Sequence, residues 1–460
     1  MRFEEIAFWQ YINLNFLFCQ FLSSWKVVAS MLNWLWKLLG FSQPDQIKQL
    51  PGELYAKKQQ TSQSKPKAKS PLKSLAPLRH LPTTPESTPA AELGDAEKAP
   101  YQFANLDVVS GRYLNLSTDS NVEQLNELQL PVLHNPADLA NWLQISVGRL
   151  AWVVDRLEEY RRPQSVKTAH YHYRWQKKSS GEYRLIEAPK PILKSIQQQI
   201  LVGILNAIPA HEAAHGFVSG RSVLSNAAEH VARQTLLSMD LDNFYGRIRF
   251  TRVVALFRTI GYSREVAIWL SRLTTSTAPS DLNTPAGSSS QIRDWTRRHL
   301  PQGAPTSPAL ANLVAYSLDV RLSGLAKKFG VTYTRYADDL TFSGDRSFRR
   351  SLRIFIPLVG QILRNERYLE KKSKRHVATS AMRQSVTGVV VNEKLNVSRK
   401  QFDQLKAILT NCVRTGPASQ NRDNHPEFRS HLMGRIAHMS MLNPRKGAKL
   451  KAIFNQIRWD

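Results

Sequence analysis

Residues 331–343 read VTYTRYADDLTFS, and this stretch is the most informative part of the sequence for predicting the fold. It is typical of two strands joined by a tight turn, with Asp338 and Asp339 adjacent at that turn. Side chains alternate between the faces of a strand and like charges repel, so two carboxylates at this place are costly. A hard divalent cation removes the cost, because Mg²⁺ takes carboxylate oxygens as ligands. Two solvated turn aspartates are the simpler alternative, since Asp is common in turns.

A second carboxylate segment, LLSMDLDNFY at residues 236–245, changes this balance. Asp240 ends its apolar run, where a strand leaves the core. In two-metal phosphoryl transfer, two cations roughly 4 Å apart clamp the attacking and leaving oxygens, and such a site needs carboxylates from different segments. Asp240 with Asp338 meets this need, and Asp339 is a third candidate. We therefore expect two Mg²⁺ ions held by these aspartates.

Between the two segments, residues 300–308 read LPQGAPTSP and open a helix. Gly303 allows the backbone to approach a ligand closely, and Pro308 suits the first turn of a helix. Free amides at a helix start bind phosphate or sugar. Taken alone, an ordinary capped helix start explains this stretch better.

Asp240 with Tyr245 five residues later, then QGAPTSP at 302–308, then YADD at 336–339, resemble in their order and spacing the motifs of a reverse transcriptase. The resemblance covers about residues 140–455. It implies an α+β right-hand polymerase, with fingers, palm and thumb, that makes DNA on RNA from dNTPs. It also implies that Gln302 and Gly303 line the nucleotide pocket.

Two further residues are expected to contact the incoming nucleotide. The bulky ring of Tyr245 would collide with a 2′-hydroxyl, which favours deoxynucleotides; a core aromatic is the alternative. Arg184 lies in GEYRLIEAP (181–189), which resembles the fingers of the family, and a guanidinium suits the triphosphate. A surface arginine on a hairpin is its alternative. Lys374 follows lysines without the Asn that the family often has there, so we do not expect it to donate a proton.

Two short signatures narrow the family. NAAEH at residues 226–230 and VTG at 386–388 resemble the NAxxH and VTG signatures of bacterial retron reverse transcriptases. That resemblance implies a structured non-coding RNA that is both template and 2′-hydroxyl primer, an effector protein in some systems, and a part in anti-phage defence. The implied RNA-binding residues are Asn226, His230, Val386, Thr387 and Gly388. Alternatively, Asn226 and His230 simply cap and pack a helix.

One motif points elsewhere. HEAAH at residues 211–215 matches the HExxH string of zinc proteases. Such a site needs the string inside a helix and a third ligand, but Pro209 precedes it, Gly216 follows at once, and no downstream Gly-x-x-His pattern completes it. We therefore expect no zinc here.

Composition agrees with a nucleic-acid partner. The 460 residues carry a net charge of +27, and such an excess attracts polyanions. Two cysteines exclude a disulfide framework and favour a reducing, cytoplasmic location. Basic residues concentrate after the Asp pair, at net +8 in residues 345–385 and again in 395–460.

The chain is expected to divide into six parts. Residues 1–41 form an aromatic, hydrophobic segment without stable membrane insertion, either an amphipathic helix or an over-extended gene start with Met31 as the true first residue. Residues 42–100 are a disordered linker rich in Pro, Ser and Lys. The folded parts are a helical region (101–165), fingers (166–235), palm (236–394) and a basic helical thumb (395–460).

Hydrophobic periodicity predicts the main elements of the folded parts. We expect a hairpin over Tyr171–Leu185, strands over Gln234–Asp240 and Val386–Asn392, and helices over Ile192–Ala207, Thr251–Ile260, Arg264–Thr274 and Pro308–Phe329. The first thumb helix should bury Phe402, Leu405, Leu409 and Val413.

Two other functions stay open at this point. A different prokaryotic reverse transcriptase, such as a group II intron protein, shares the polymerase motifs, although about 65 residues after Asn392 leave little room for its extra sections. A catalytically silent RNA-binding scaffold is the second alternative, and the presence of all three carboxylates argues against it.

Overall fold

The computed structural model describes residues 92–93, 99–107, 111–155, 162–178, 181–285 and 295–459. The expectations for residues 1–41 and for nearly all of 42–100 lie outside these ranges. Within them, no helix has the length and apolar character needed to cross a membrane.

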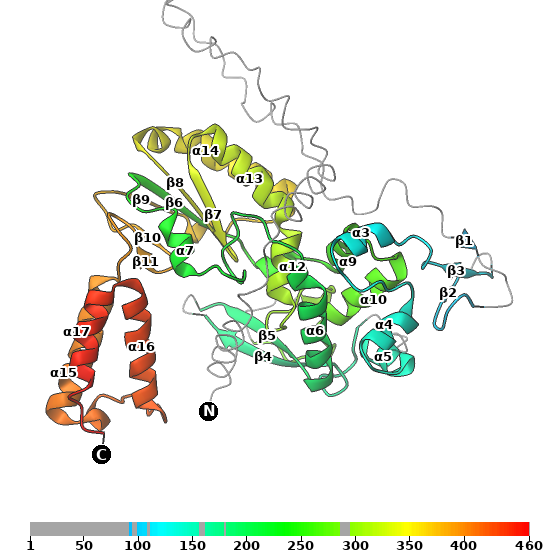
Figure 1. Ribbon diagram of the computed structural model, residues 1–460, viewed down its shortest axis with the longest axis horizontal. Coiled ribbons are helices and arrows are strands. Elements are labelled where there is room, and N and C mark those ends of the chain that lie inside the picture. The colour runs from blue at the N-terminus through cyan, green and yellow to red at the C-terminus, as the bar shows by residue number, and fades with distance from the viewer. Residues whose placement is uncertain are drawn as a thin grey trace, which may run out of the picture.

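Four antiparallel strands form the palm sheet, in the spatial order β7-β8-β6-β9 (Figure 1). The strands are β6 (Thr235–Asp240), β7 (Thr332–Tyr336), β8 (Asp339–Gly344) and β9 (His376–Thr379). The hairpin predicted for residues 331–343 and the strand ending at Asp240 are therefore both confirmed. They pair directly, because β6 runs beside β8 with Asp240 opposite Asp339.

The two faces of the palm sheet have different roles. Leu237 and Met239 of β6, and Leu340 and Phe342 of β8, belong to the main hydrophobic core. Helices α13 (Tyr316–Lys328) and α14 (Arg346–Asn365) contact the strands and each other (Figure 1). Leu236 joins a second core instead. Side chains alternate along a strand, so the even-numbered residues of β6 point away from the main core.

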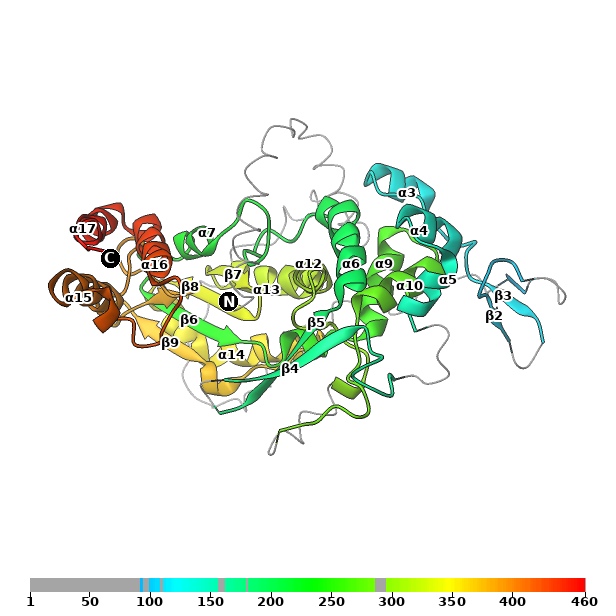
Figure 2. The ribbon, with the colours of Figure 1, turned by 90° about the horizontal axis from the view of Figure 1, so that it is seen from below.

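A hairpin and several helices extend the main core away from the sheet. The fingers hairpin is β4 (Tyr171–Lys177) paired with β5 (Tyr183–Pro189), and α6 (Pro191–Gly203) follows it. The helices that complete this part are α3 (Val122–Glu127), α4 (Pro136–Trp142), α5 (Val147–Val153), α9 (Phe250–Ile260), α10 (Arg264–Thr274) and α12 (Ser307–Val314). A small sheet with the strand order β1-β3-β2 lies at the end of the molecule that holds α3–α5 (Figures 1 and 2). Its strands are Glu92–Leu93, Asn105–Leu106 and Tyr113–Asn115 for β1, β2 and β3.

The thumb helices are α15 (Arg399–Thr415), α16 (Phe428–Leu442) and α17 (Pro444–Phe454). They lie at the opposite end of the molecule from α3–α5 (Figures 1 and 2). Their buried faces form the second core, together with Val386, Val389 and Val391 and with Ala227 of α7 (Val223–Ala228). The thumb core therefore includes residues that precede the thumb helices.

The remaining elements are short: η4 (Leu205–Ala207), α8 (Phe244–Arg247), η5 (Lys372–Lys374), β10 (Ser385–Val386), β11 (Val389–Val390) and η6 (Pro417–Ser419).

Four expectations about elements need correction. The segment Val386–Asn392 is not one strand: β10 and β11 form a hairpin, because Thr387 and Gly388 both adopt positive φ, at 46° and 85°, and turn the chain back. The helix expected over Pro308–Phe329 is interrupted at Ala315 into α12 and α13. The helix over Ile192–Ala207 ends at Gly203, before η4. In α15 the buried residue after Leu409 is Cys412, three positions later, and not Val413, four positions later. Val413 is 39% exposed.

Candidate active site

Three aspartates meet at one end of the palm sheet. Asp240 is the last residue of β6 and has the same parity as Leu236, so its side chain leaves the sheet on the face opposite the main core. Asp339 begins β8 directly across from it. Asp338 lies in the turn between β7 and β8, and its carbonyl accepts a hydrogen bond from Leu241 N at 2.9 Å. The structure thus brings together the three carboxylates that the sequence singles out.

Two of these carboxyl groups hold their protons more tightly than usual. Burial, followed by the charge of Asp240, raises the pKa of Asp338 above its ordinary value. Burial, together with the charges of Asp338 and Asp240, raises the pKa of Asp339 to about 6. Both pKa shifts arise because negative charges lie close together in a partly buried site. A bound cation would offset this repulsion.

Lys374 provides some of this relief. Its Nζ lies 2.5 Å from Asp240 Oδ1, although the lysine side chain is 54% exposed. Burial disfavours the charged ammonium, but the hydrogen bond to Asp240 and the charges of all three aspartates raise the pKa of Lys374. The sequence does not predict a proton-donating role for this lysine, because the Asn that the family often has before its lysines is missing. The structure shows its ion pair with Asp240, a contact that the sequence did not reveal.

The aspartates fit a magnesium ion better than a preassembled metal cage. Across the described ranges, no three His, Cys, Asp or Glu side chains are grouped closely enough to hold a metal ion by themselves. Mg²⁺ is usually bound by one or two carboxylates, waters and substrate phosphates, so it does not need such a group. The carboxylate groups of Asp240, Asp338 and Asp339 supply oxygen atoms of the kind that Mg²⁺ binds.

The fingers hairpin reaches this carboxylate site. Arg184 of β5 is close enough for its charge to lower the pKa of Asp338 partway back and to influence Tyr245. At the tip of the hairpin, Glu182 forms an ion pair with Lys371, whose backbone nitrogen donates to Asp240 O at 2.8 Å. Arg184 therefore lies near Asp338 and Tyr245, and the contact of Glu182 with Lys371 is one that the sequence did not reveal.

Tyr245 follows the end of β6 and lies beside the carboxylates. Burial, followed by the charge of Asp338, raises the pKa of the Tyr245 hydroxyl well above its ordinary value. Its ring packs edge-on against Phe244, with the ring centroids 5.4 Å apart. The ring is thus buried against Phe244 and lies near Asp338.

The residues predicted to line the nucleotide pocket, Gln302 and Gly303, lie between the fingers hairpin and α12. The carbonyl of Gln302 accepts a hydrogen bond from Glu187 N at 2.9 Å. Gly303 has φ of +130°, and a Cβ there would come within 3.0 Å of Glu187 O, so this position has room only for glycine. The buried hydroxyls of Thr306 and Ser307 have no partner within the described residues. They are polar groups at a helix start that a bound ligand would satisfy.

The residues expected from the NAxxH signature are buried. His230 is fully buried and bridges two strands, with Nδ1 2.7 Å from Ser343 Oγ and Nε2 2.7 Å from Thr334 Oγ1. Burial, followed by the charges of His215 and Arg233, lowers the pKa of His230 to about 3, so the ring is neutral. Both nitrogens are engaged, so His230 braces the palm sheet, and contact with RNA through this ring requires rearrangement.

Asn226 and the VTG segment lie at one junction. Asn226 is 1% exposed, and its side-chain oxygen and nitrogen have no hydrogen-bond partner within the part of the chain that the structure describes. Its helix, α7, contacts both β10 and β11, where Val386 is buried and the Thr387 hydroxyl also lacks a described partner. Gly388 is exposed at the tip of this turn.

The HEAAH string does not have the structure that a zinc protease requires. Residues 211–215 lie in a loop that pairs with the edge of β7, where Ala214 bridges Arg335. His211 Nδ1 accepts a hydrogen bond from Ala213 N at 3.0 Å, and His215 Nδ1 lies 2.9 Å from Ser225 Oγ. Without a helix, the two imidazoles do not share the face that HExxH needs.

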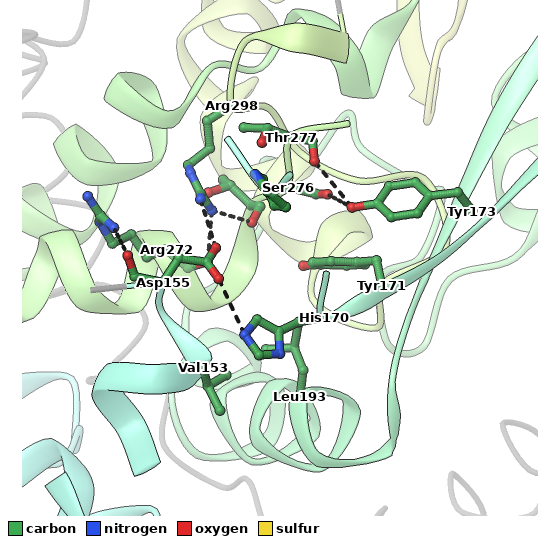
Figure 3. Close-up of a pocket in the computed structure, with 12 residues that line it drawn as sticks. Val153, Asp155, His170, Tyr171, Tyr173, Leu193, Arg272, Ser276, Thr277 and Arg298 are labelled. Carbon is green, nitrogen blue, oxygen red and sulfur yellow. Dashed lines mark hydrogen bonds and ion pairs between the residues drawn. The ribbon is translucent and has the colours of Figure 1, made fainter. Parts of the chain in front are cut away.

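A second polar cluster lies at the base of the fingers hairpin, around a small cavity (Figure 3). Asp155 joins His170 at 3.3 Å and Arg298 at 3.2 Å, and Tyr173 donates to Thr277 O at 3.2 Å. Burial alone would raise the pKa of Asp155, but its hydrogen bond to His170 and the charge of Arg298 lower it overall. These contacts connect Asp155, which follows α5, to the fingers hairpin and to the segment that follows α10.

Comparisons with known proteins agree with this site. A family model described as reverse transcriptase (RNA-dependent DNA polymerase) matches residues 175–405, which include all three aspartates. The retron Mx65 reverse transcriptase of Myxococcus xanthus is 38% identical over 334 residues, which cover 71% of this chain and 73% of that protein. The retron Mx162 reverse transcriptase of the same organism is 34% identical over 343 residues, which cover 71% of this chain and 68% of that protein.

A third relative, the retron Ec86 reverse transcriptase of Escherichia coli, is 30% identical over 292 residues, covering 62% of this chain and 81% of that protein. The sequence motifs, the convergence of their carboxylates on one sheet and these relatives lead to one conclusion. The chain belongs to the reverse transcriptase family and, within that family, to the retron reverse transcriptases.

Proposed function

We propose that Asp240, Asp338 and Asp339 bind two Mg²⁺ ions and that the protein extends DNA on an RNA template at this site. The observation that carries the proposal is the meeting of three carboxylates, two with raised pKa values, at the end of the palm sheet. When bound, the metal would stabilise the charge that develops during phosphoryl transfer.

The chain's own residues divide the remaining tasks. Arg184 of the fingers hairpin binds the triphosphate, and Gln302 and Gly303 shape the nucleotide pocket against β5. Tyr245 excludes the 2′-hydroxyl, which selects dNTPs. Lys374, beside Asp240, is placed to balance charge and to deliver a proton near the carboxylates. This last role reverses our expectation from the lysine pattern.

We further propose that the template and primer belong to one structured non-coding RNA, which primes from a 2′-hydroxyl. The thumb helices and the β10–β11 hairpin, with its exposed Gly388, form the surface that grips this RNA. Support comes from the basic charge around them and from the shared core that joins hairpin and thumb. An effector protein, a part in anti-phage defence and a cytoplasmic location belong to the same proposal, by likeness to retron systems.

The carboxylate assignment is tested by Asp338→Asn and Asp339→Asn. Each change removes one charge from the metal site and should abolish Mg²⁺-dependent primer extension while the protein stays folded. Asp345→Asn is the matched control, because Asp345 caps α14 and Asn caps a helix equally well. Primer extension at saturating dNTP, with folding checked by circular dichroism, makes the comparison. Wild-type rates in either catalytic variant would contradict the assignment and favour a silent scaffold.

A further inference from the structure

The turn that presents the catalytic aspartates is conformationally strained. Ala337, directly before Asp338, has φ of +54°, in the left-handed region that alanine rarely occupies. Such a conformation persists only where the surroundings over-determine it. The direction of the Asp338 and Asp339 side chains therefore depends on whatever holds Ala337.

A buried arginine holds it from behind the sheet. Arg335 is fully buried and donates from Nη1 to the carbonyl of Ala337 at 3.2 Å. Its Nε and Nη2 donate to the two carboxylate oxygens of Asp319 in α13, at 2.8 and 2.6 Å. Nη1 also donates to Asn312 Oδ1 of α12 at 2.9 Å. One guanidinium thus joins two helices to the catalytic turn.

Asn312 carries the connection to a second support. Its Nδ2 donates to the carbonyl of Gly216 at 2.8 Å. A Cβ at Gly216 would lie 2.7 Å from Ala337 N, so this glycine packs directly against the strained peptide. The neighbouring backbone is fastened to β7 as well, because His215 N donates to Arg335 O at 2.8 Å and Arg335 N to Ala213 O at 2.7 Å.

We infer that Arg335, Asn312 and Gly216 are positioning residues, which fix Ala337 and thereby aim Asp338 and Asp339 at the metal-binding place. Because α12 begins just after Gln302 and Gly303, the same network ties the nucleotide pocket to the carboxylates. The inference rests on the proposed role of the aspartates.

Stability alone does not explain this arrangement. A buried ion pair is often no more stabilising than well-packed apolar residues of similar volume, so stability does not require Arg335. Its planar fork reaches Asp319, Asn312 and Ala337 at once, and a lysine ammonium cannot match that geometry. The network therefore has the properties of an orienting device.

Gly216→Ala is the sharpest test, because it adds one methyl group and changes no charge. The backbone at Gly216 does not need glycine, since no positive φ is found there. The methyl is excluded by its neighbours, which are Ala337 N at 2.7 Å and Tyr336 at 3.2 Å. Gly324→Ala is the matched control: Gly324 lies in α13, and its Cβ would meet nothing within 4 Å. We expect kcat to fall at least tenfold in Gly216→Ala and to be unchanged in Gly324→Ala.

Side-chain variants test the network itself. Asn312→Leu removes both of its hydrogen bonds, whereas Asn312→Asp keeps the acceptor for Arg335 and should lose less activity. Arg335→Lys keeps the charge and loses the fork. In all three, kcat should fall and the half-saturating Mg²⁺ concentration should rise several-fold, while KM for dNTP changes less than kcat.

Two readouts separate positioning from folding. Titration of active sites on an RNA–DNA duplex gives the folded, competent fraction, and electron paramagnetic resonance of Mn²⁺ measures metal binding without turnover. The inference is supported if fully competent variants bind Mn²⁺ more weakly and turn over slowly. It is overturned if activity falls only with the folded fraction, or if folded variants keep the wild-type kcat and metal midpoint. Wild-type protein without metal-dependent extension would count against the proposed function instead.

Discussion

Asp339 shows most clearly how the catalytic site opposes folding. Its pKa of about 6 lies above the ordinary value of 3.8, so the folded protein favours the protonated form. The stability that this group contributes is complete below about pH 4 and is lost as the pH rises through about 6. The ionised form, which is the one proposed to bind metal, is therefore the form that destabilises the metal-free protein.

This sign gives a testable pH dependence. Without Mg²⁺, the thermal midpoint of the wild type should fall relative to that of Asp339→Asn between about pH 4 and pH 7, because Asn does not titrate. Excess Mg²⁺ should remove the difference, since it binds the ionised form. Thermal unfolding of both proteins, with chelator and with Mg²⁺, makes the measurement. Parallel midpoints across this range in chelator would show that Asp339 is not perturbed by its neighbours.

At the level of single residues, the sequence predicts the candidate metal-binding residues better than the buried residues that hold them in place. Asp240, Asp338 and Asp339 are recognisable because paired carboxylates beside apolar runs have few structural uses. Arg335 is different: nothing in the pattern shows that an arginine between Thr334 and Tyr336 is fully buried. Its partners Asp319 and Asn312 come from helices whose packing only the folded chain defines.

Among the elements, the fingers hairpin is the one that spans two parts of the site. Its tip residue Glu182 forms an ion pair with Lys371. The hydrogen bond from Lys371 lowers the pKa of Glu182, and burial opposes this effect without cancelling it. The side chains are 37% and 18% exposed, so the pair is partly screened by solvent. It holds the hairpin that carries Arg184 against the strand end that carries Asp240.

We predict that Glu182→Gln and Lys371→Gln each raise KM for dNTP by about twofold to fivefold, as expected for a partly exposed ion pair. The double variant should be no worse than either single variant, because both act through one contact. Steady-state kinetics of the four proteins form the cycle, with Lys372→Gln as the control. Strictly additive effects would show that the two residues act independently.

The β10–β11 hairpin tests how the RNA is chosen. Thr387→Asn keeps the turn, since Asn-Gly is the preferred pair for two positive φ angles, but it replaces the side chain. This change should weaken cognate RNA more than scrambled RNA. Lys406→Ala and Arg435→Ala in the thumb should weaken both RNAs alike and reduce the salt dependence, because phosphate contacts carry no sequence information. Binding curves at several salt concentrations decide, and equal losses for both RNAs with Thr387→Asn would exclude this segment as the reader.

This hairpin also shows where prediction of elements stops. A run of valines around Thr387 and Gly388 has the composition of one strand, and only the backbone angles reveal two. The break of α12 and α13 at Ala315 is equally invisible, because the hydrophobic spacing continues through it. By contrast, α9 and α10 agree with their expected ranges to within one residue, because hydrophobic periodicity defines them clearly.

Over the whole molecule, the described residues form a large main core, a smaller thumb core and a small third cluster around Leu185 and Trp295. The main core joins α3–α5, the fingers and one face of the palm sheet, whereas the thumb core is smaller and includes the β10–β11 hairpin. Domain limits drawn from charge and linkers place the hairpin in the palm. The buried side chains of Val386 and Val389 place it with the thumb instead.

Leu409→Ala should therefore act on a defined part of the molecule. Leu409 is fully buried in the thumb core, and its truncation should destabilise that part by about 2–5 kcal/mol. Amide hydrogen exchange should become faster in α15–α17 and in β10–β11, and should stay unchanged in β7 and β8. Faster exchange throughout the palm sheet would show that the two cores unfold as one.

The shared core of hairpin and thumb has a consequence for recombination between retron enzymes. A crossover at the start of α15 would separate Val386, Val389 and Val391 from the helices that bury them, leaving mismatched surfaces on both sides of the joint. A crossover just before Gln384 would carry the hairpin with its own thumb, and the contacts with α7 and with Leu236 of β6 would have to be rebuilt. Inheritance of RNA choice should then follow the hairpin and thumb as one transferable module.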